Sequence, residues 1–394
     1  MLFQIHAALA ATPETDDDGD GDDDSKHDLV WNHTDLGGYV EANANWALVG
    51  AATKPTGVVS LRRAALEIKQ DLGPKIPAEA EMELEVEDAV SSTGSLGRVE
   101  VEEAELEWHV VGEAVEARAG LLEMPFGWIN EHHHPGDFNG VERPTIDTIL
   151  VPTTWRELGA GVGGETGRWR YSLYATTAFD PANFDDAGVV NGRTLGSSSP
   201  GMAIGFVGRA EVKPWRDGLV GASGYASDAG GAGDWYDGTG NSLRLSLPVF
   251  GAELDAHGSI GPFTLKTEGV YWSLPQSDDL MEADKIDGSP YFPDGSGVVP
   301  TAMIGGYVEG SVDLFGPLHV PGRLDAFGRL EHYDSQFAVP DGYTANPERT
   351  VDEGTFGLTW GPGGDVVVKA DIVLRDRKLG DDELRWDAGV GWAF

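Results

Sequence analysis

Eight glutamates occur at every second position of two neighbouring segments, residues 78–88 and 98–110. Alternate side chains of a strand point to the same face, so this spacing would gather the carboxylates on one face. Lipid cannot accommodate eight carboxylates, so we expect them to face a water-filled interior. There they would favour cations over anions. The predicted lining acids are Glu79, Glu81, Glu83, Glu85, Glu87, Glu103, Glu105 and Glu107.

Basic side chains on the polar faces of other alternating segments are expected to line the same interior. Ion pairs with part of the acidic lining would then reduce its net charge. The predicted basic lining residues are Arg118, Arg209, Lys369, Arg375 and Arg385, with Arg170, Lys266 and Arg323 as further inward candidates.

Three consecutive histidines, His132, His133 and His134, suggest metal binding. Adjacent residues seldom converge on one ion, and no second pair of ligands has metal-site spacing. The pattern therefore favours transient binding of divalent ions by histidine and carboxylate, and no specific metal site is predicted.

Motifs for enzymatic chemistry are weak or incomplete. Residues 159–164 match a dinucleotide-binding glycine pattern by letter, but no helix follows to hold a pyrophosphate. Residues 16–21 resemble the opening of a calcium loop, yet His27 stands where the bidentate glutamate belongs. No nucleophile elbow, zinc-protease motif or phosphate loop occurs. We therefore predict neither an enzyme nor a cofactor. A barrel enzyme is the weaker alternative, because it would need a Ser-His or Asp-His pair in the interior or at the rim, and no such pair stands out.

The alternation that positions these side chains continues through sixteen strand-length segments. In the last segment every second residue from Leu384 to Phe394 is apolar. A phase change at 102–104 predicts a β-bulge, and Pro248 predicts another. The predicted strands are 38–49, 58–70, 78–88, 98–110, 113–124, 154–165, 168–178, 202–213, 218–227, 242–257, 262–274, 301–315, 320–334, 350–361, 364–376 and 382–394.

The connections support a barrel independently, because their lengths alternate. Those after even strands are mostly tight, whereas those after odd strands are mostly long. Outer-membrane barrels have short turns at one end and long loops at the other. Each strand in lipid needs two hydrogen-bonding neighbours, and sixteen strands leave an aqueous bore. The sequence therefore predicts an all-β, 16-stranded antiparallel transmembrane barrel. The long connections are 125–153, 179–201, 228–241, 275–300 and 335–349.

Aromatic residues near strand ends or on lipid-facing positions are expected to form girdles at the two membrane interfaces. These residues are Trp46, Trp108, Trp169, Tyr171, Trp272, Trp360, Trp386 and Trp392.

Composition narrows the function. The 394 residues carry a formal net charge of −39, which disfavours nucleic-acid binding. The acidity suggests a high-salt habitat, where screening weakens self-repulsion; a solvated acidic surface is the simpler reading. There is no cysteine, so disulfides are excluded, and no apolar run is long enough for a spanning helix.

Three domains are predicted. Residues 1–11 resemble the end of a signal peptide, although they lack its positive start; an ordinary tail is the alternative. Residues 12–35 form an acidic segment that we expect to be disordered, and residues 36–394 form the barrel.

Residues 120–163 resemble bacterial outer-membrane porins of the broad group that includes the phosphate-selective porins. The resemblance lies in PFG (125–127), NEHH (130–133), GVERP (140–144) and TWRELG (154–159). The terminal Trp392-Ala393-Phe394 resembles the signature that such proteins present to the barrel-assembly machinery. The resemblance implies a porin in outer-membrane lipid, usually a homotrimer. The resemblance does not imply phosphate selectivity for this chain. A phosphate pore would need an inward cluster of lysine and arginine, whereas several strands here are lined by glutamate.

The resemblance also implies that the third long loop folds into the barrel and narrows it. An ordinary loop on the rim is the alternative. The predicted constriction residues are Glu131, His132, His133, His134, Asp137, Glu142 and Arg143.

The predicted function is passive diffusion of small hydrophilic solutes and ions with a mild cation preference. A plugged barrel acting as a surface receptor or structural protein is the alternative. A soluble acidic β-protein is a weaker one.

Overall fold

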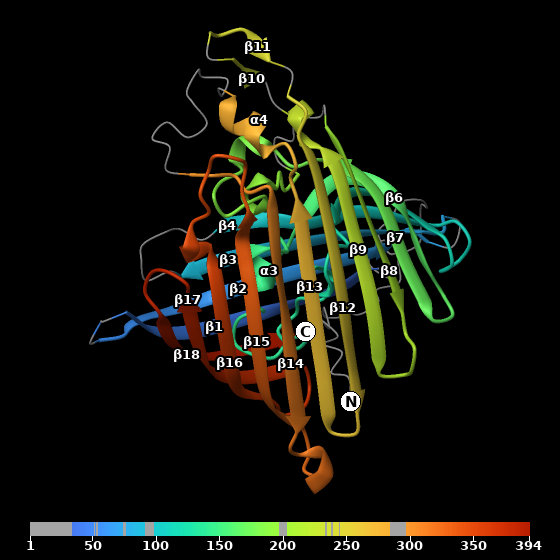
Figure 1. Ribbon diagram of the computed structural model, residues 1–394. Helices are drawn as coiled ribbons and strands as arrows, with labels where there is room; N and C mark the ends of the chain where they lie inside the picture. The colour runs from blue at the N-terminus through green and yellow to red at the C-terminus, as the bar shows by residue number, and fades with distance from the viewer. Residues whose placement is uncertain are drawn as a thin grey trace.

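Sixteen antiparallel strands close into a barrel in the computed structural model, as the sequence predicts (Figure 1). Every strand pairs with two neighbours, so no edge of the sheet is left open to lipid. The structure describes residues 34–50, 52, 54–73, 76–90, 98–196, 203–232, 235–237, 239–243, 245–283 and 297–394. The predicted signal remnant and nearly all of the acidic segment lie outside these residues.

The observed strands follow the predicted ranges closely. Their bounds are β1 (Thr34–Val49), β2 (Thr56–Asp71), β3 (Ala78–Val90), β4 (Arg98–His109), β5 (Glu116–Glu123), β6 (Arg156–Thr166), β7 (Trp169–Thr177), β8 (Ile204–Val212), β9 (Gly218–Asp228), β12 (Pro248–Ile260), β13 (Phe263–Ser273), β14 (Ala302–Asp313), β15 (Arg323–Ala338), β16 (Thr350–Gly361), β17 (Val366–Arg377) and β18 (Glu383–Ala393).

The first and last strands close the barrel. Antiparallel pairing runs without a break from Tyr39 opposite Ala393 to Val49 opposite Glu383. The apolar alternation of β18 therefore continues across the closure, where Trp46 lies opposite Trp386. Cross-strand pairs of this kind stabilise the register because a slip by one residue would exchange the lipid-facing and inner faces.

One strand prediction needs correction. The strand predicted at 242–257 begins only at Pro248, and β12 pairs with β9 and β13 without a register shift. The bulge predicted at Pro248 is therefore wrong, because a proline at the first position of a strand removes no interior ladder bond. The preceding residues instead contribute to a small separate hairpin of β10 (Trp235–Tyr236) and β11 (Ser242–Leu243).

The bulge predicted near 102–104 is confirmed. Glu83 lies opposite Glu103, but Leu84 lies opposite Val101, so Glu102 is an additional residue in β4. A second bulge was not predicted. Glu41 lies opposite Arg63 and Ala42 lies opposite Leu61, which makes Arg62 the additional residue of β2.

The two ends of the barrel differ, as the loop lengths predict. We call the end with the long connections the outer end and the other the short-turn end. Most short helices lie in outer connections, and the structure shows α4, β10 and β11 beyond one end of the strands (Figure 1). No helix among the described residues has the length and apolar character needed to cross a membrane. The short helices are α2 (Trp128–Glu131), α3 (Ile146–Ile149), η1 (Pro181–Asn183), η2 (Val190–Gly192), η3 (Ala229–Ala232), α4 (Ser277–Glu282) and η5 (Pro347–Arg349), with η4 (Gly316–Leu318) at the short-turn end.

The outward faces of the strands carry exposed apolar side chains, as a lipid-facing surface requires. Trp46, Trp108, Trp169 and Trp360 are among them. Trp272 is not, so its predicted place in a girdle is wrong. It is fully buried inside the barrel, and its Nε1 donates to the carbonyl of Leu150, 2.8 Å away.

Aromatic side chains pack inside the barrel near its outer end. Trp155 stacks on Phe179 with ring centroids 4.8 Å apart, and Phe126 contacts Trp272 at 4.9 Å. Tyr225 packs on both Trp155 and Phe179. These rings come from β9, β13 and the loops after β5 and β7. This part of the interior is therefore an apolar core rather than a wet channel.

Candidate functional site

The loop between β5 and β6, residues 124–155, crosses the interior of the barrel. We call it L3, because it is the third outer connection. Its polar groups bond to inward side chains of four strands on the far wall. The contacts are Asn139 Nδ2 to Glu309 on β14 (2.9 Å), Ile146 N to Glu331 on β15 (3.1 Å), Thr145 Oγ1 to Glu353 on β16 (2.7 Å) and Val141 N to Asp371 on β17 (2.6 Å).

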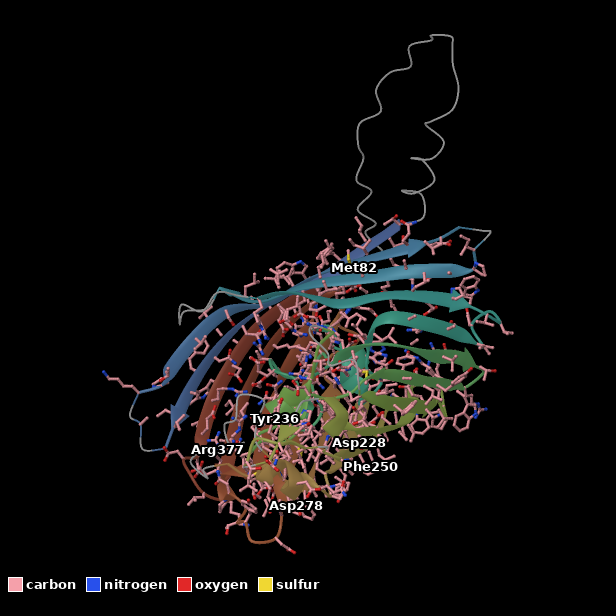
Figure 2. All side chains as sticks on the ribbon, turned by 90° about the horizontal axis from the view of Figure 1, so that it is seen from above. Met82, Asp228, Tyr236, Phe250, Asp278 and Arg377 are labelled. Carbon is pink, nitrogen blue, oxygen red and sulfur yellow. The ribbon has the colours of Figure 1, made fainter. Side chains whose placement is uncertain are left out.

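Glycines on the wall let L3 approach closely. A Cβ added to Gly391 on β18 would lie 2.4 Å from Cβ of Pro135. A Cβ added to Gly305 on β14 would lie 2.4 Å from Cδ1 of Leu150. Larger residues at either position would displace the loop, so the wall is shaped to receive it. Seen along the barrel, side chains gather within the ring of strands (Figure 2).

The predicted glutamates lie together where β3 faces β4, with Glu79 opposite Glu107, Glu81 opposite Glu105 and Glu83 opposite Glu103. Glu83, Glu85 and Glu105 are buried. The side chain of Glu87 lies outside the described residues. Near the short-turn end, the acids are neutralised in part by Lys69 and Arg118. Lys69 Nζ is 2.8 Å from Glu79, and Arg118 contacts Glu105 and Glu107.

The predicted basic residues are held in ion pairs at separate places on the wall. Arg209 bridges Glu211, Glu253 and Asp255. Lys369 differs: its buried Nζ has no hydrogen-bond partner among the described residues and lies 3.6 Å from the centroid of Phe138. Arg375 pairs with Glu353 at 2.6 Å, and Arg385 pairs with Asp387 at 2.7 Å.

A cavity of about 560 Å³ lies between L3 and the wall at the outer end. Eight arginines and three glutamates line it. Its lining carries a larger excess of basic residues than the linings of the other cavities in the described interior. Of these charged residues L3 contributes Glu142 and Arg143, and Nη2 of Arg143 has no hydrogen-bond partner among the described residues. The lining arginines are Arg62, Arg63, Arg98, Arg143, Arg156, Arg193, Arg375 and Arg385; the glutamates are Glu41, Glu100 and Glu142.

A second cavity of about 300 Å³ lies toward the short-turn end. Phe138 lines both cavities, so this buried side chain of L3 lies between them. The Lys369 ammonium contacts the Phe138 ring at this point.

The predicted constriction residues lie at different places along L3 and do not line one common cavity. Only Glu142 and Arg143 line the outer cavity. Glu131 pairs with Arg170 at 3.3 Å, near β7 and β8. Asp137 accepts from the backbone of His134 at 3.0 Å and lines the second cavity.

The three histidines face different surroundings. His132 stacks on Trp128 with centroids 4.7 Å apart. His133 is buried, and burial lowers its pKa to about 4, so its ring is neutral at pH 7. His134 contacts Glu67 at 3.2 Å, and this carboxylate raises the pKa of the histidine.

Several charged residues of the interior were not predicted from the sequence. The Arg62 bulge breaks the period of two, so alternation alone cannot place Arg62 and Arg63 on one face. Arg156 lies in the TWRELG run at the end of L3. Its position at the start of a strand could have indicated that it faces the interior. Asp147 on α3 is fully buried, and burial raises its pKa.

Comparisons with known proteins agree with this architecture. The family model described as phosphate-selective porin O and P matches residues 48–316. An uncharacterized protein of Aquifex aeolicus (strain VF5) is 25% identical over 365 residues, which cover 91% of this chain and 79% of that protein.

Solved porin structures share the fold at low identity. The anion-selective porin from Comamonas acidovorans is 12% identical with a TM-score of 0.55, covering 92% of this chain and 99% of that one. Salmonella typhi OmpF, solved with daunomycin, is 10% identical with a TM-score of 0.57, covering 92% and 97%. The Acinetobacter baumannii channel DcaP is 15% identical with a TM-score of 0.54, with the same coverage.

The family match extends over more than half of the chain, and the closed 16-stranded barrel matches the porin fold. The chain belongs to the phosphate-selective porin O and P family and is a non-enzymatic channel of the outer membrane.

Proposed function

We propose that the channel carries small hydrophilic solutes by passive diffusion and that its passage beside L3 favours anions. The observation that supports this proposal is the outer cavity, where eight arginines face three glutamates. Low-dielectric walls focus the field of such a lining and raise the local concentration of anions. The family's description as phosphate-selective, and the name of the anion-selective Comamonas porin, point the same way.

A mild cation preference, predicted from the glutamate pattern, is the second candidate. It is favoured by the net charge of −39 and by buried carboxylate oxygens without hydrogen-bond partners on Glu102 and Glu268. Glu79, Glu105 and Glu107 are paired with Lys69 or Arg118. Arg375 and Arg385 of the outer cavity are likewise paired, with Glu353 and Asp387, whereas Arg143 keeps a nitrogen without a hydrogen-bond partner among the described residues. The two candidates predict opposite signs of the reversal potential.

A plugged barrel is the remaining alternative, because L3 and the aromatic core occupy much of the interior. The cavities on the two sides of Phe138 support an open channel, because a plug would fill the bore on both sides. Conductance of the folded protein in planar bilayers separates these alternatives.

The test of anion preference uses Arg143→Gln, which removes a lining charge of L3. A unit charge about 8 Å away contributes roughly 0.5 kcal/mol in water, and screening at about 0.15 M salt reduces this to roughly 0.2 kcal/mol. The effect has opposite signs for chloride and potassium, so the permeability ratio of chloride to potassium should fall about twofold. Lys213→Gln is the matched control, because it removes a positive charge whose ion pair is half exposed at the short-turn end.

A chloride-favouring wild type that Arg143→Gln weakens and Lys213→Gln leaves unchanged would support the proposal. A potassium-favouring wild type would contradict it and support the second candidate.

We also propose three properties of the whole protein. It would assemble as a homotrimer, which the mass of the detergent-purified protein tests. The C-terminal Phe394 would engage the barrel-assembly machinery, so deleting it should reduce membrane assembly. A high-salt habitat, suggested by the acidic composition, predicts that stability rises with salt.

A further inference from the structure

We infer that Glu83, Glu102 and His133 form a binding site for one divalent transition-metal ion. A carboxylate oxygen from each glutamate and a ring nitrogen of the histidine all lie within 4.8 Å of one another. The three residues come from β3, β4 and L3, so the site would join the loop to the barrel wall. All three are buried, with Glu102 at 1% and His133 at 3% exposure.

The donor atoms have no conventional hydrogen-bond partner among the described residues, although Glu102 lies beside Glu85, whose carboxyl can share a proton with it. Both carboxylate oxygens of Glu102, Oε1 of Glu83 and Nε2 of His133 have no hydrogen-bond partner among the described residues. The nearest guanidinium nitrogen to Glu102, on Arg156, is 3.9 Å away, and that group bonds to Glu100 at 2.5 Å instead. Burying carboxylates without compensation is costly, so their arrangement calls for a cation or for protons.

The histidine is held in the form that a metal requires. Its Nδ1 lies 2.8 Å from the carbonyl oxygen of Asn130 and donates to it. Nε2 is then the nitrogen with the free lone pair. A backbone acceptor on the other ring nitrogen is the usual way in which proteins fix the tautomer of a metal-binding histidine.

The bulge in β4 brings the second carboxylate into place. Glu102 is the additional residue, and Glu103 follows it opposite Glu83. The bulge places Glu102 and Glu103 consecutively on the inner face, whereas in a regular strand only one of the two could point inward. Bulges redirect side chains in this manner, and here the redirected group completes a set that includes Glu85 and Glu123, each with an unpartnered oxygen.

The donor set indicates the class of ion. Carboxylates combined with one imidazole suit Zn²⁺ or Mn²⁺, whereas Ca²⁺ and Mg²⁺ take oxygen ligands. The consecutive histidines argued against a specific site because adjacent residues seldom converge. In the structure they do not converge: His132 stacks on Trp128 and His134 contacts Glu67, so only His133 joins the acids.

The test is metal titration of the folded, detergent-solubilised full chain after treatment with EDTA. Isothermal titration with Zn²⁺ and with Mn²⁺ should show one equivalent per chain, and Ca²⁺ should compete poorly. His133→Gln and Glu102→Gln should each weaken binding tenfold or more.

Two controls isolate the site. His132→Gln changes the neighbouring residue of the same run. His109→Gln changes a second, partly exposed cluster with Glu107 and Glu116, whose acids are already paired with Arg118. Both controls should bind the ion as the wild type does.

X-ray absorption at the zinc edge of the wild type tests the site even where a variant fails to fold. One imidazole nitrogen with carboxylate oxygens around the ion would support the assignment. No stoichiometric binding, or an ion surrounded by oxygen alone, would overturn it and leave shared protons as the compensation. Unchanged affinity in both folded ligand variants would also overturn it.

Discussion

Replacing Arg209 with methionine would leave three buried carboxylates without their shared cation. The guanidinium lies 2.7 Å from Glu211, 3.0 Å from Glu253 and 2.6 Å from Asp255, and its side chain is only 2% exposed. Breaking a buried ion pair by removing one partner costs about 3–5 kcal/mol, because the remaining charge stays buried. Methionine preserves most of the side-chain volume, so the loss reports charge rather than a cavity.

Lys213→Met is the matched comparison on the same side of the barrel. It also removes one positive charge, but its partner Glu165 is 3.3 Å away and both side chains are about half exposed. Such a pair contributes about 0.2–1 kcal/mol. Urea unfolding in detergent micelles, followed by tryptophan fluorescence and by the electrophoretic shift between folded and unfolded barrel, measures both variants.

Arg209→Met should lose several times more unfolding free energy than Lys213→Met. Adding Glu253→Gln to Arg209→Met should recover part of the loss, because it removes one uncompensated carboxylate. Equal, small losses in the two single variants would refute the argument, since the carboxylates would then be compensated without the guanidinium.

Two further perturbations test the interior of the barrel. Trp155→Ala should destabilise the folded barrel by about 3–5 kcal/mol, because it removes a buried ring that stacks on Phe179, and unfolding in urea measures the loss; a cost below about 1 kcal/mol would show that this core is loosely packed. Asp147 has its pKa raised by burial, so the folded state holds its proton more tightly than the unfolded chain. The stability contributed by this tighter proton binding is fully present below the unfolded pKa of about 4, and it is lost as the pH rises through the raised pKa of the folded state. Asp147→Asn should therefore flatten the fall in unfolding free energy between about pH 4 and about pH 8, the window set by the unfolded pKa and the raised pKa of about 8, and an unchanged slope would contradict the assignment.

The strands were predictable because lipid and water impose opposite demands on the two faces of each one. The alternation of apolar and polar residues in 382–394 and 350–361 follows directly from these demands. The alternating loop lengths then predict which end of the barrel each connection lies at. The tenth strand was predicted too early because 242–247 continue the apolar pattern into a loop. There Leu245 and Leu247 are buried in the interior core rather than facing lipid.

The charged interior was less predictable, because its arrangement depends on contacts between distant segments. The bulges at Arg62 and Glu102 place two consecutive charged residues on the inner face, which strict alternation does not allow. Which charges remain unpaired depends on the contacts of L3. The path of this loop across the barrel cannot be predicted from the pattern of any single strand. Trp272 shows the same limit: its sequence position fits a girdle, but contact with Leu150 places it inside.

The most direct test of the account is the reversal potential of the purified protein in planar bilayers under a potassium chloride gradient. The outer cavity, with eight arginines against three glutamates, predicts open conductance steps and a potential of the sign for chloride preference, reduced in Arg143→Gln. A potential of the sign for potassium preference would contradict the role of the arginine lining. Absence of conductance from correctly folded protein would contradict the open channel itself.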